Sequence, residues 1–263
     1  MRPACLVLAP LALAALACAQ TSPTSTAVSY TAAGVVNSAS DAPDALAPNT
    51  IATVYGTGLS YVTQFAFLTM PASGVMPTEI GGVRVYVGEQ AAPLYYVSPS
   101  QINFLIPTEL RPGDMDFFTT HDGLAGPHVR ITLHDAGPGL YPWGAGMIAS
   151  THADGSLITK DHPAHPGETV VVYGTGLGRT HPELQTGMIE MVAAQILLLD
   201  ELSVMVAGTP LDNQRIQYAG ITPGTPGLYQ VNLVLPKALA PDPEIRISIG
   251  AQLSPPGMRL PAH

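Results

Sequence analysis

The hexapeptide VYGTGL occurs twice in this chain, at residues 54–59 and 172–177. The match extends toward the N-terminus, since residues 47–59 read APNTIATVYGTGL and residues 165–177 read HPGETVVVYGTGL. Because the chain has no low-complexity tract, a repeat of this length indicates that one structural unit is present in two copies.

Two later pairs of segments match in the same order. VRVYVGEQAAP (83–93) resembles LSVMVAGTP (202–210), and QINFLIP (101–107) resembles QVNLVLP (230–236). The spacing between the copies grows from one pair to the next, as loop insertions into a duplicated domain would cause. We therefore predict an internal duplication.

Each block has the pattern of a β-strand followed by a turn. The runs TIATVY and TVVVY are rich in β-branched residues, and Gly-Thr-Gly then supplies residues that tolerate a positive φ. Leu59 and Leu177, which follow, are expected to pack into a core. VRVYV and QINFLI alternate apolar and polar residues, which predicts strands with one buried face, Gln101 and Asn103 lying on the other.

The turn-forming residues decide the predicted fold class. The 263 residues include 26 Gly and 26 Pro, and long amphipathic helical patterns are missing. The sequence therefore predicts an all-β fold of two tandem Ig-like β-sandwich domains, at residues 28–137 and 138–263. The Gly- and Pro-rich segment 135–146 is the expected junction. Its Trp143 is interpreted either as an anchor between the domains or as an ordinary residue at the edge of a core.

The first 19 residues have the pattern of a secretory signal peptide, with one Arg, a short apolar run and small residues at the end. Cleavage after Ala19 would leave a short linker over residues 20–27 and no cysteine, since Cys5 and Cys18 both lie in the leader. The alternative is cleavage before Cys18 with a lipid anchor on it. In both cases we predict a protein that is secreted, periplasmic or on the cell surface.

The charge balance argues against two classes of partner. The formal net charge is −9, and charged residues make up 11% of the chain. Nucleic acids and anionic membrane surfaces are bound through basic patches, so neither is an expected partner. No second apolar stretch is long enough to span a bilayer, so no transmembrane segment is predicted after removal of the signal.

The repeated blocks and the segments around them resemble a known family, the Solibacter-type C-terminal domain of acidobacterial secreted proteins. Its Ig-like sandwiches are similar to TIG/IPT domains. The resemblance implies a secreted, non-catalytic module that often ends larger surface proteins, with no catalytic residue to carry over. The matching segments are GVVNSAS, LAPNTIATVYGTGLS, APLYYVSPSQINFLIPTEL, ADGSL, HPAHPGETVVVYGTGLG and TPGLYQVNLVLP.

The chain departs from the family's pattern near its C-terminal end. Residues 162–167 read His-Pro-Ala-His-Pro-Gly where the family has Asn-Pro-Ala-x-Pro-Gly. Residues 186–202 are more apolar than the usual connection and are expected to be more helical. The ending SPPGMRLPAH is too rich in Pro for a last strand, which leaves the closure of the second sandwich open.

Sequence patterns for nucleotide binding and catalysis are missing. The Gly-x-Gly turns have Tyr61 and Arg179 where a dinucleotide fingerprint requires a third Gly. There is no Gly-x-Ser-x-Gly, and the predicted mature chain has no Cys nucleophile. The Ser, His and Asp of STHADGS are expected to form a hairpin turn. We predict a protein that is not an enzyme and that uses no cofactor.

Histidines are concentrated between His152 and His181. Imidazole and carboxylate groups are ligands for zinc, which makes a metal-binding protein or a metal-dependent enzyme an alternative function. Loop histidines exposed to solvent are the other interpretation. The candidate metal ligands are His152, Asp154, His162 and His165.

A Gln-x-Asn pair recurs at equivalent places in the two copies, as Gln101 with Asn103 and Gln230 with Asn232. Amides on one strand face can hydrogen-bond to the hydroxyls of a sugar. Amides that tie a neighbouring loop by bonding to its backbone are the other interpretation. Tyrosines near the pairs are candidates to stack on a sugar ring, namely Tyr95, Tyr96, Tyr218 and Tyr229.

The leading functional prediction is a secreted, non-catalytic pair of Ig-like modules that binds an extracellular protein or a glycan, or takes part in surface assembly. A metal-binding protein or metal-dependent enzyme that uses the segment from His152 to His181 is one alternative. A glycan-binding module that uses the amide pairs together with Tyr96 and Tyr218 is another.

Overall fold

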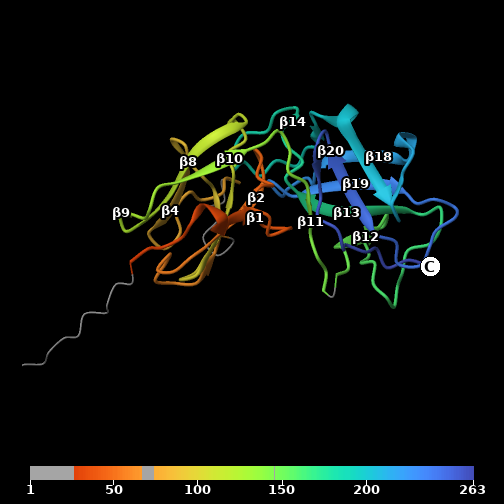
Figure 1. Ribbon diagram of the computed structural model, residues 1–263, viewed down its shortest axis with the longest axis horizontal. Coiled ribbons are helices and arrows are strands. Elements are labelled where there is room, and N and C mark those ends of the chain that lie inside the picture. Colours follow the sequence, from red (N-terminus) through yellow and green to blue (C-terminus); the bar gives the residue numbers. More distant parts are fainter. Residues whose placement is uncertain (1–26, 67–73, 145) are drawn as a thin grey trace, which may run out of the picture.

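The computed structural model describes residues 27–66, 74–144 and 146–263. Within them the chain is all-β, as predicted, and its helical segments are short 3₁₀ turns at Ala32–Gly34 (η1), Leu199–Glu201 (η3) and Asn213–Arg215 (η4). Figure 1 shows two lobes side by side, one for each half of the chain. The predicted signal peptide and nearly all of the predicted linker lie outside the described residues.

The N-terminal half, residues 27–133, contains two antiparallel sheets around one core. Side chains from both sheets, including Val54, Phe104, Val85 and Phe117, form a single buried cluster, as in a β-sandwich. One sheet has the order β1 (Val35–Asn37), β2 (Ile51–Tyr55), β7 (Gln101–Leu105), β6 (Leu94–Val97) and β3 (Gln64–Phe65). The other has the order β10 (Val129–Leu133), β8 (Gly113–His121), β4 (Val83–Val87) and β5 (Gln90–Ala91), with β9 (Leu124–Ala125) paired to β8.

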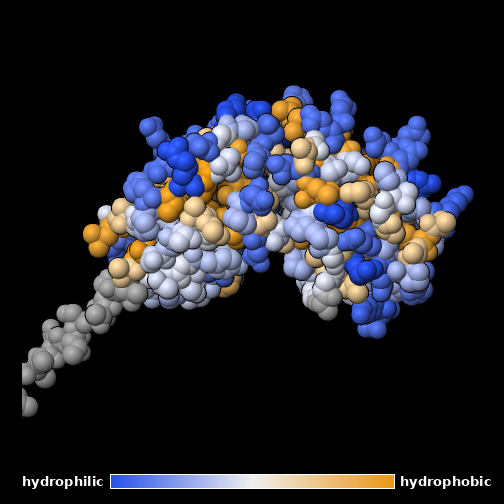
Figure 2. All heavy atoms as spheres, in the orientation of Figure 1, coloured by the Kyte–Doolittle hydropathy of each residue, from blue (hydrophilic) through white to orange (hydrophobic). Residues whose placement is uncertain are grey.

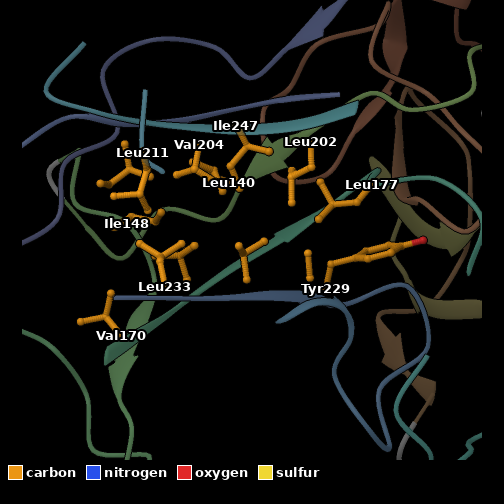
Figure 3. Close-up of a cluster of buried hydrophobic side chains, with 14 of the residues drawn as sticks. Leu140, Ile148, Val170, Leu177, Leu202, Val204, Leu211, Tyr229, Leu233 and Ile247 are labelled. Atoms are coloured by element: carbon orange, nitrogen blue, oxygen red, sulfur yellow. The ribbon is translucent and has the colours of Figure 1, made fainter. Parts of the chain in front are cut away.

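The C-terminal half, residues 136–263, has the same construction. Figure 3 shows its core, in which Leu202, Val204 and Ile247 of one sheet face Val170 and Leu233 of the other. One sheet has the order β11 (Gly139–Leu140), β13 (Thr169–Thr175), β19 (Tyr229–Val234), β18 (Ile216–Ile221), β15 (Gln195–Ile196) and β14 (Thr180–His181), with β12 (Ser150–His152) paired to β13. The other has the order β17 (Thr209–Pro210), β16 (Leu202–Val206), β20 (Ile245–Ile249) and β21 (Gln252–Leu253).

The predicted core residues of the repeated blocks are buried. The three valines of β4 are inaccessible to solvent, and Ile102 and Phe104 of β7 are buried while Gln101 and Asn103 are half-buried on the other face. Leu59 and Leu177 are each 1% exposed. The alternation therefore predicted correctly which face of each strand meets the core.

The two halves also repeat one pattern of strand pairing. Tyr55 lies opposite Gln101 across β2 and β7, and Tyr173 lies opposite Gln230 across β13 and β19. The register shifts between residues 94 and 96 where β6 pairs with β7, and between residues 216 and 218 where β18 pairs with β19. An irregularity at the same place in both halves supports the predicted duplication.

The division between the halves falls near the predicted junction. The buried cluster of the N-terminal half ends at Leu133, and that of the C-terminal half begins with Ala136. The two clusters therefore separate between residues 133 and 136, and the boundary between residues 137 and 138 stays a prediction. Trp143 is 55% exposed, so the hypothesis that it anchors one domain against the other is wrong.

Hydrogen bonds between buried or half-buried groups join the halves. Asn37 donates to the carbonyl of Gly137 (2.9 Å), and the backbone N–H of Ile51 donates to Thr175 Oγ1 (2.9 Å). Asn49 Nδ2 donates to the hydroxyl of Tyr229 (3.0 Å). In Figure 3 the ring of Tyr229 lies in the C-terminal core and its hydroxyl points out of it. Figure 2 shows a notch between the lobes at the lower edge of the view.

The segment 186–202 differs from its predicted helical character. Apart from the short η3 turn it is irregular or extended, because it leaves the C-terminal half to bond to the backbone of the other half. Met76 N donates to the carbonyl of Gly187 (2.8 Å), and Ile189 N donates to the carbonyl of Gly74 (2.8 Å). A backbone that bonds to another segment in this way cannot also close helical turns.

The Pro-rich C-terminal end completes the second sandwich without forming a strand. Leu260 and Ala262 are buried in the C-terminal core. Ile148 N donates to the carbonyl of Arg259 (2.8 Å), and Ala164 N donates to that of Pro261 (2.9 Å). Among the described residues no helix has the length and apolar character required to cross a membrane.

Candidate functional site

A cavity of about 450 Å³ opens between the two halves. Its volume falls in the range of small-molecule binding sites. The C-terminal half contributes Tyr141, Ile189 and the loop Gly224–Pro226 to its lining. The N-terminal half contributes Ser38, Ile51, Thr53, Tyr55, Phe65, Ala66, Met76, Tyr95, Tyr96, Gln101 and Asn103.

Strand register places a polar cluster in this cavity. Thr53 lies opposite Asn103 across β2 and β7, and Tyr55 lies opposite Gln101. Their neighbours Val54, Ile102 and Phe104 are buried in the core, so the alternation along each strand turns these polar side chains outward. The outward face of the N-terminal sandwich is therefore the floor of the cavity.

Hydrogen bonds within the polar cluster fix which atoms face a ligand. Asn103 Oδ1 accepts from Gln101 Nε2 (2.8 Å) and from Thr53 Oγ1 (3.2 Å). The carbonyl oxygen of Asn103 is thus satisfied, and its amide nitrogen is left to donate. Gln101 keeps its carbonyl oxygen as an acceptor, and Thr53 Oγ1 keeps its lone pairs. The cluster presents donors and acceptors side by side.

Aromatic rings stand beside the cluster. Phe65 on β3 and Tyr96 on β6 are cross-strand neighbours whose ring centroids lie 4.7 Å apart at an interplanar angle of 47°. Phe65 is 45% exposed and Tyr55 is 44% exposed, a large share for apolar rings. Exposed aromatic faces next to amides are the usual composition of a binding surface.

The wall from the C-terminal half is held by tyrosine hydroxyls. Tyr95 donates to the carbonyl of Pro226, and the hydroxyls of Tyr141 and Ser38 are 2.7 Å apart. Burial raises the pKa of Tyr141 to about 12 and that of Tyr95 further still. Both phenols therefore stay protonated in the physiological range. The Tyr95 bond ties the loop Gly224–Pro226 to the N-terminal half, and the Tyr141 bond ties Tyr141 to Ser38.

Among the described residues of the cavity lining, the ionisable side chains are all tyrosines. None of the described residues that line it is Asp, Glu, His, Lys or Arg. Next to the lining, the carboxylate of Asp41 accepts a hydrogen bond through Oδ1 from Tyr55 Oη (3.3 Å). Burial together with the Asp41 charge raises the pKa of Tyr55.

The second copy of the Gln-x-Asn pair lies elsewhere. Gln230 Nε2 donates to Asn232 Oδ1 (3.0 Å), which reproduces the bond of the first pair, but neither residue lines the cavity between the halves. Tyr218 is bonded to the carbonyls of Ala194 (3.2 Å) and Ile221 (2.8 Å), so its hydroxyl serves the backbone. The structure therefore brings Tyr96, Gln101 and Asn103 together and leaves Gln230, Asn232 and Tyr218 apart from them.

The hydroxyls of two other tyrosines, Tyr229 and Tyr95, bond to groups of the protein itself. Tyr229 is fully buried, and its hydroxyl bonds to Gly178 and Asn49. Tyr95 lines the cavity, but its hydroxyl is taken by Pro226. A role in stacking on a sugar is therefore open to Tyr96 and not to Tyr229.

The predicted metal site is not formed. Among the described residues no group of three or more His, Cys, Asp or Glu side chains is placed to hold a metal ion. His152 Nδ1 bonds to Glu168, and its Nε2 lies 3.3 Å from the carbonyl oxygen of His162. Asp154 accepts instead from the backbone N–H and hydroxyl of Ser156 in the hairpin turn, and His165 Nδ1 lies 3.2 Å from the carbonyl of His263.

Several cavity residues were not predicted from the sequence. Tyr55 precedes the first Gly of the repeated turn and lies opposite Gln101, so the aligned repeats contained a signal for it. Phe65 belongs to a two-residue strand with no alternation to read. Tyr141, Ile189 and Thr225 reach the cavity through the packing of the halves, which no local pattern in the sequence encodes.

Comparisons with known proteins give low similarity. No protein-family model and no curated protein matches the chain. Among solved structures, the chain is similar to the Bacteroides ovatus mixed-linkage glucan utilization locus SGBP-B in complex with a mixed-linkage heptasaccharide (TM-score 0.30, 12% identity, 78% of this chain and 36% of that one). It is also similar to the surface glycan-binding protein PbSGBP-B from Prevotella bryantii (TM-score 0.25, 10% identity, 80% and 36%).

A third similar structure is SGBP-B from a complex xyloglucan utilization locus in Bacteroides uniformis (TM-score 0.26, 12% identity, 82% of this chain and 46% of that one). The chain therefore spans less than half the length of these structures. At such scores and identities we draw no conclusion about its function from them.

Proposed function

We propose that this protein is a non-catalytic, extracytoplasmic binding protein whose ligand is a glycan held in the cavity between its two halves. One observation carries the proposal: the Thr53, Gln101 and Asn103 cluster lies in the cavity beside the exposed rings of Phe65 and Tyr55. The signal pattern of residues 1–19 supports a location outside the cytoplasm.

The chemistry of a sugar matches this arrangement. Each hydroxyl of a pyranose both donates and accepts a hydrogen bond, and the cluster offers the amide of Asn103 as donor next to the carbonyl of Gln101 as acceptor. The less polar faces of sugar rings pack against aromatic side chains, as the faces of Phe65 and Tyr96 permit. Together the two kinds of contact orient a ligand that has both properties.

A binding role fits the lining better than hydrolysis. Glycoside hydrolysis in most enzymes requires a pair of carboxyl groups on either side of the scissile bond. The described residues of the cavity lining include no carboxyl group. We therefore propose that the protein holds a glycan without cleaving it, whichever sugars make up that glycan.

Retention in native gels containing soluble polysaccharides tests the proposal. We expect at least one polysaccharide to slow migration of the wild-type chain, and Asn103→Ala and Phe65→Ala each to weaken that retention several-fold to about tenfold. Phe65 is nearly half exposed, so its truncation should leave the fold intact.

Asn232→Ala is the matched control for Asn103→Ala. Asn232 makes the same hydrogen bond with Gln230 but does not line the cavity, so we expect full retention. Equal loss in both Asn variants would place binding elsewhere. Failure of every polysaccharide in the panel to retain the wild-type protein would reject the proposed function.

A further inference from the structure

The charge of the cavity constrains which glycans it accepts. We infer that the ligand is a neutral glycan and that uronic or sulfated glycans are excluded. This inference rests on the function proposed above. It specifies the chemical class of the ligand from the side chains that line the cavity.

The lining offers no cation to pair with an acidic group. No Lys, Arg or His is among the described residues that line the cavity. A carboxylate or sulfate moved from water into this site would lose hydration without gaining an opposite charge, which is unfavourable. Neutral hydroxyls lose far less, because the amides of Gln101 and Asn103 replace their bonds to water.

A negative charge stands at the edge of the cavity. The carboxylate of Asp41 accepts a hydrogen bond from Tyr55, whose ring lines the cavity and is 44% exposed. An acidic sugar packed on that ring would lie near this carboxylate and be repelled by it. The formal net charge of −9 on the whole chain adds a weaker repulsion at long range.

The described residues of the wall from the C-terminal half carry no positive charge that would offset the Asp41 carboxylate. The hydroxyl of Tyr141 is paired with that of Ser38, and the carbonyl of Pro226 accepts from Tyr95 of the N-terminal half. The three loop residues that line the cavity, Gly224, Thr225 and Pro226, carry no charge. An anion would therefore meet uncharged groups on this side as well.

The test compares one polysaccharide that binds with its own carboxymethylated or sulfated derivative, for instance hydroxyethylcellulose with carboxymethyl hydroxyethylcellulose. The backbone is shared, so the comparison isolates the charge. We expect the derivative to bind about tenfold more weakly or worse, and binding of the neutral polymer to be unchanged between low salt and 0.5 M salt, roughly the concentration at which surface charges are screened.

The outcomes separate this inference from the proposed function. Equal or tighter binding of the acidic derivative, or retention by acidic polysaccharides only and weakened by salt, would overturn the inference and leave glycan binding in place. Retention by no polysaccharide, neutral or acidic, would reject the proposed function and the inference with it.

A pair of variants locates the source of the repulsion. Asp41→Asn removes the carboxylate next to Tyr55 and keeps a side chain that tolerates the positive φ of 54° found there. We expect Asp41→Asn to reduce the difference in binding affinity between the neutral polymer and its acidic derivative. Asp44→Asn removes an exposed carboxylate that does not line the cavity and should leave the difference unchanged. An unchanged difference in Asp41→Asn would overturn the role assigned to Asp41.

Discussion

His152 and Glu168 form an ion pair inside the histidine-rich segment, where a metal site was predicted. His152 is 8% exposed and bonds through Nδ1 to the Glu168 carboxylate. Burial by itself lowers the pKa of His152, but the hydrogen bond and charge of Glu168 outweigh it and raise that pKa. Burial likewise raises the pKa of Glu168, and the bonds from His152 and from the backbone of His165 outweigh it and lower that pKa.

These shifts predict how stability depends on pH. A histidine whose pKa is raised above 6.5 stabilises the fold below pH 6.5 and loses that contribution as the pH rises through its folded-state pKa. A glutamate whose pKa is lowered below 4.5 stabilises the fold above pH 4.5 and loses its contribution as the pH falls through its folded-state pKa. The pair should therefore contribute most between about pH 4.5 and 6.5.

Thermal melts across pH check this. We expect the melting temperature of Glu168→Gln to fall below that of the wild type most at pH 5–6, roughly the centre of that window, and the difference to shrink toward pH 8. Glu89→Gln removes an exposed carboxylate and serves as the charge-matched control. A constant difference at every pH would show that the ion pair does not set the pH dependence.

At the scale of elements, the two glycines of each repeated Gly-Thr-Gly turn meet different constraints, except that Gly176 meets both, since a Cβ there would also lie 2.1 Å from the carbonyl oxygen of Gly137. The second glycine has a positive φ, 66° at Gly58 and 79° at Gly176, as predicted for a turn. The first glycine does not. A Cβ on Gly56 would lie 2.4 Å from the carbonyl oxygen of Ser29, and one on Gly174 would lie 2.4 Å from that of Gly139. A neighbouring backbone therefore requires the first glycine.

This difference predicts an order of destabilisation. Gly174→Ala forces a methyl group into a backbone oxygen and should lower the free energy of unfolding by about 2–3 kcal/mol. Gly155→Ala places its methyl group in open space and strains only a φ of 87°, which should cost about 1–2 kcal/mol. Urea denaturation of both variants measures the order. A larger loss in Gly155→Ala would contradict the importance of the close approach.

The pairing of elements also explains why the amide pairs were found and their surroundings were not. Alternation along residues 101–105 is local, so the sequence predicts which face Gln101 and Asn103 occupy. The hydrogen bond between the two amides recurs as 2.8 Å and 3.0 Å in the two halves, because each pair spans two positions of one strand. The interpretation that these amides serve structure alone is open for Gln230 and Asn232, whereas Gln101 and Asn103 line a cavity.

At the scale of the whole molecule, the position of the halves creates the cavity. The contact of Asn49 with Tyr229 is central to it, since Tyr229 is fully buried and its hydroxyl joins the C-terminal core to the N-terminal half. A double-mutant cycle with Asn49→Ala and Tyr229→Phe should give a coupling energy of about 1 kcal/mol.

Calorimetric or denaturant unfolding of the two single variants and the double variant measures this coupling. Tyr173→Phe combined with Asn49→Ala is the control, because the Tyr173 hydroxyl lies 3.2 Å from Thr151 within the C-terminal half. The effects of Tyr173→Phe and Asn49→Ala on the free energy of unfolding should simply add. A coupling energy of zero for Asn49 and Tyr229 would show that their bond does not help to hold the halves together.

The sequence by itself determined the all-β class and the buried faces of the repeated strands, because these depend on alternation and turn residues that act over a few positions. Tertiary structure alone decided which copy of the Gln-x-Asn pair faces a cavity, how residues 186–202 and the C-terminal end are used, and that His152 bonds to Glu168. Those outcomes depend on contacts between residues far apart in the chain, and two copies of one pattern acquire different surroundings only when the halves pack together.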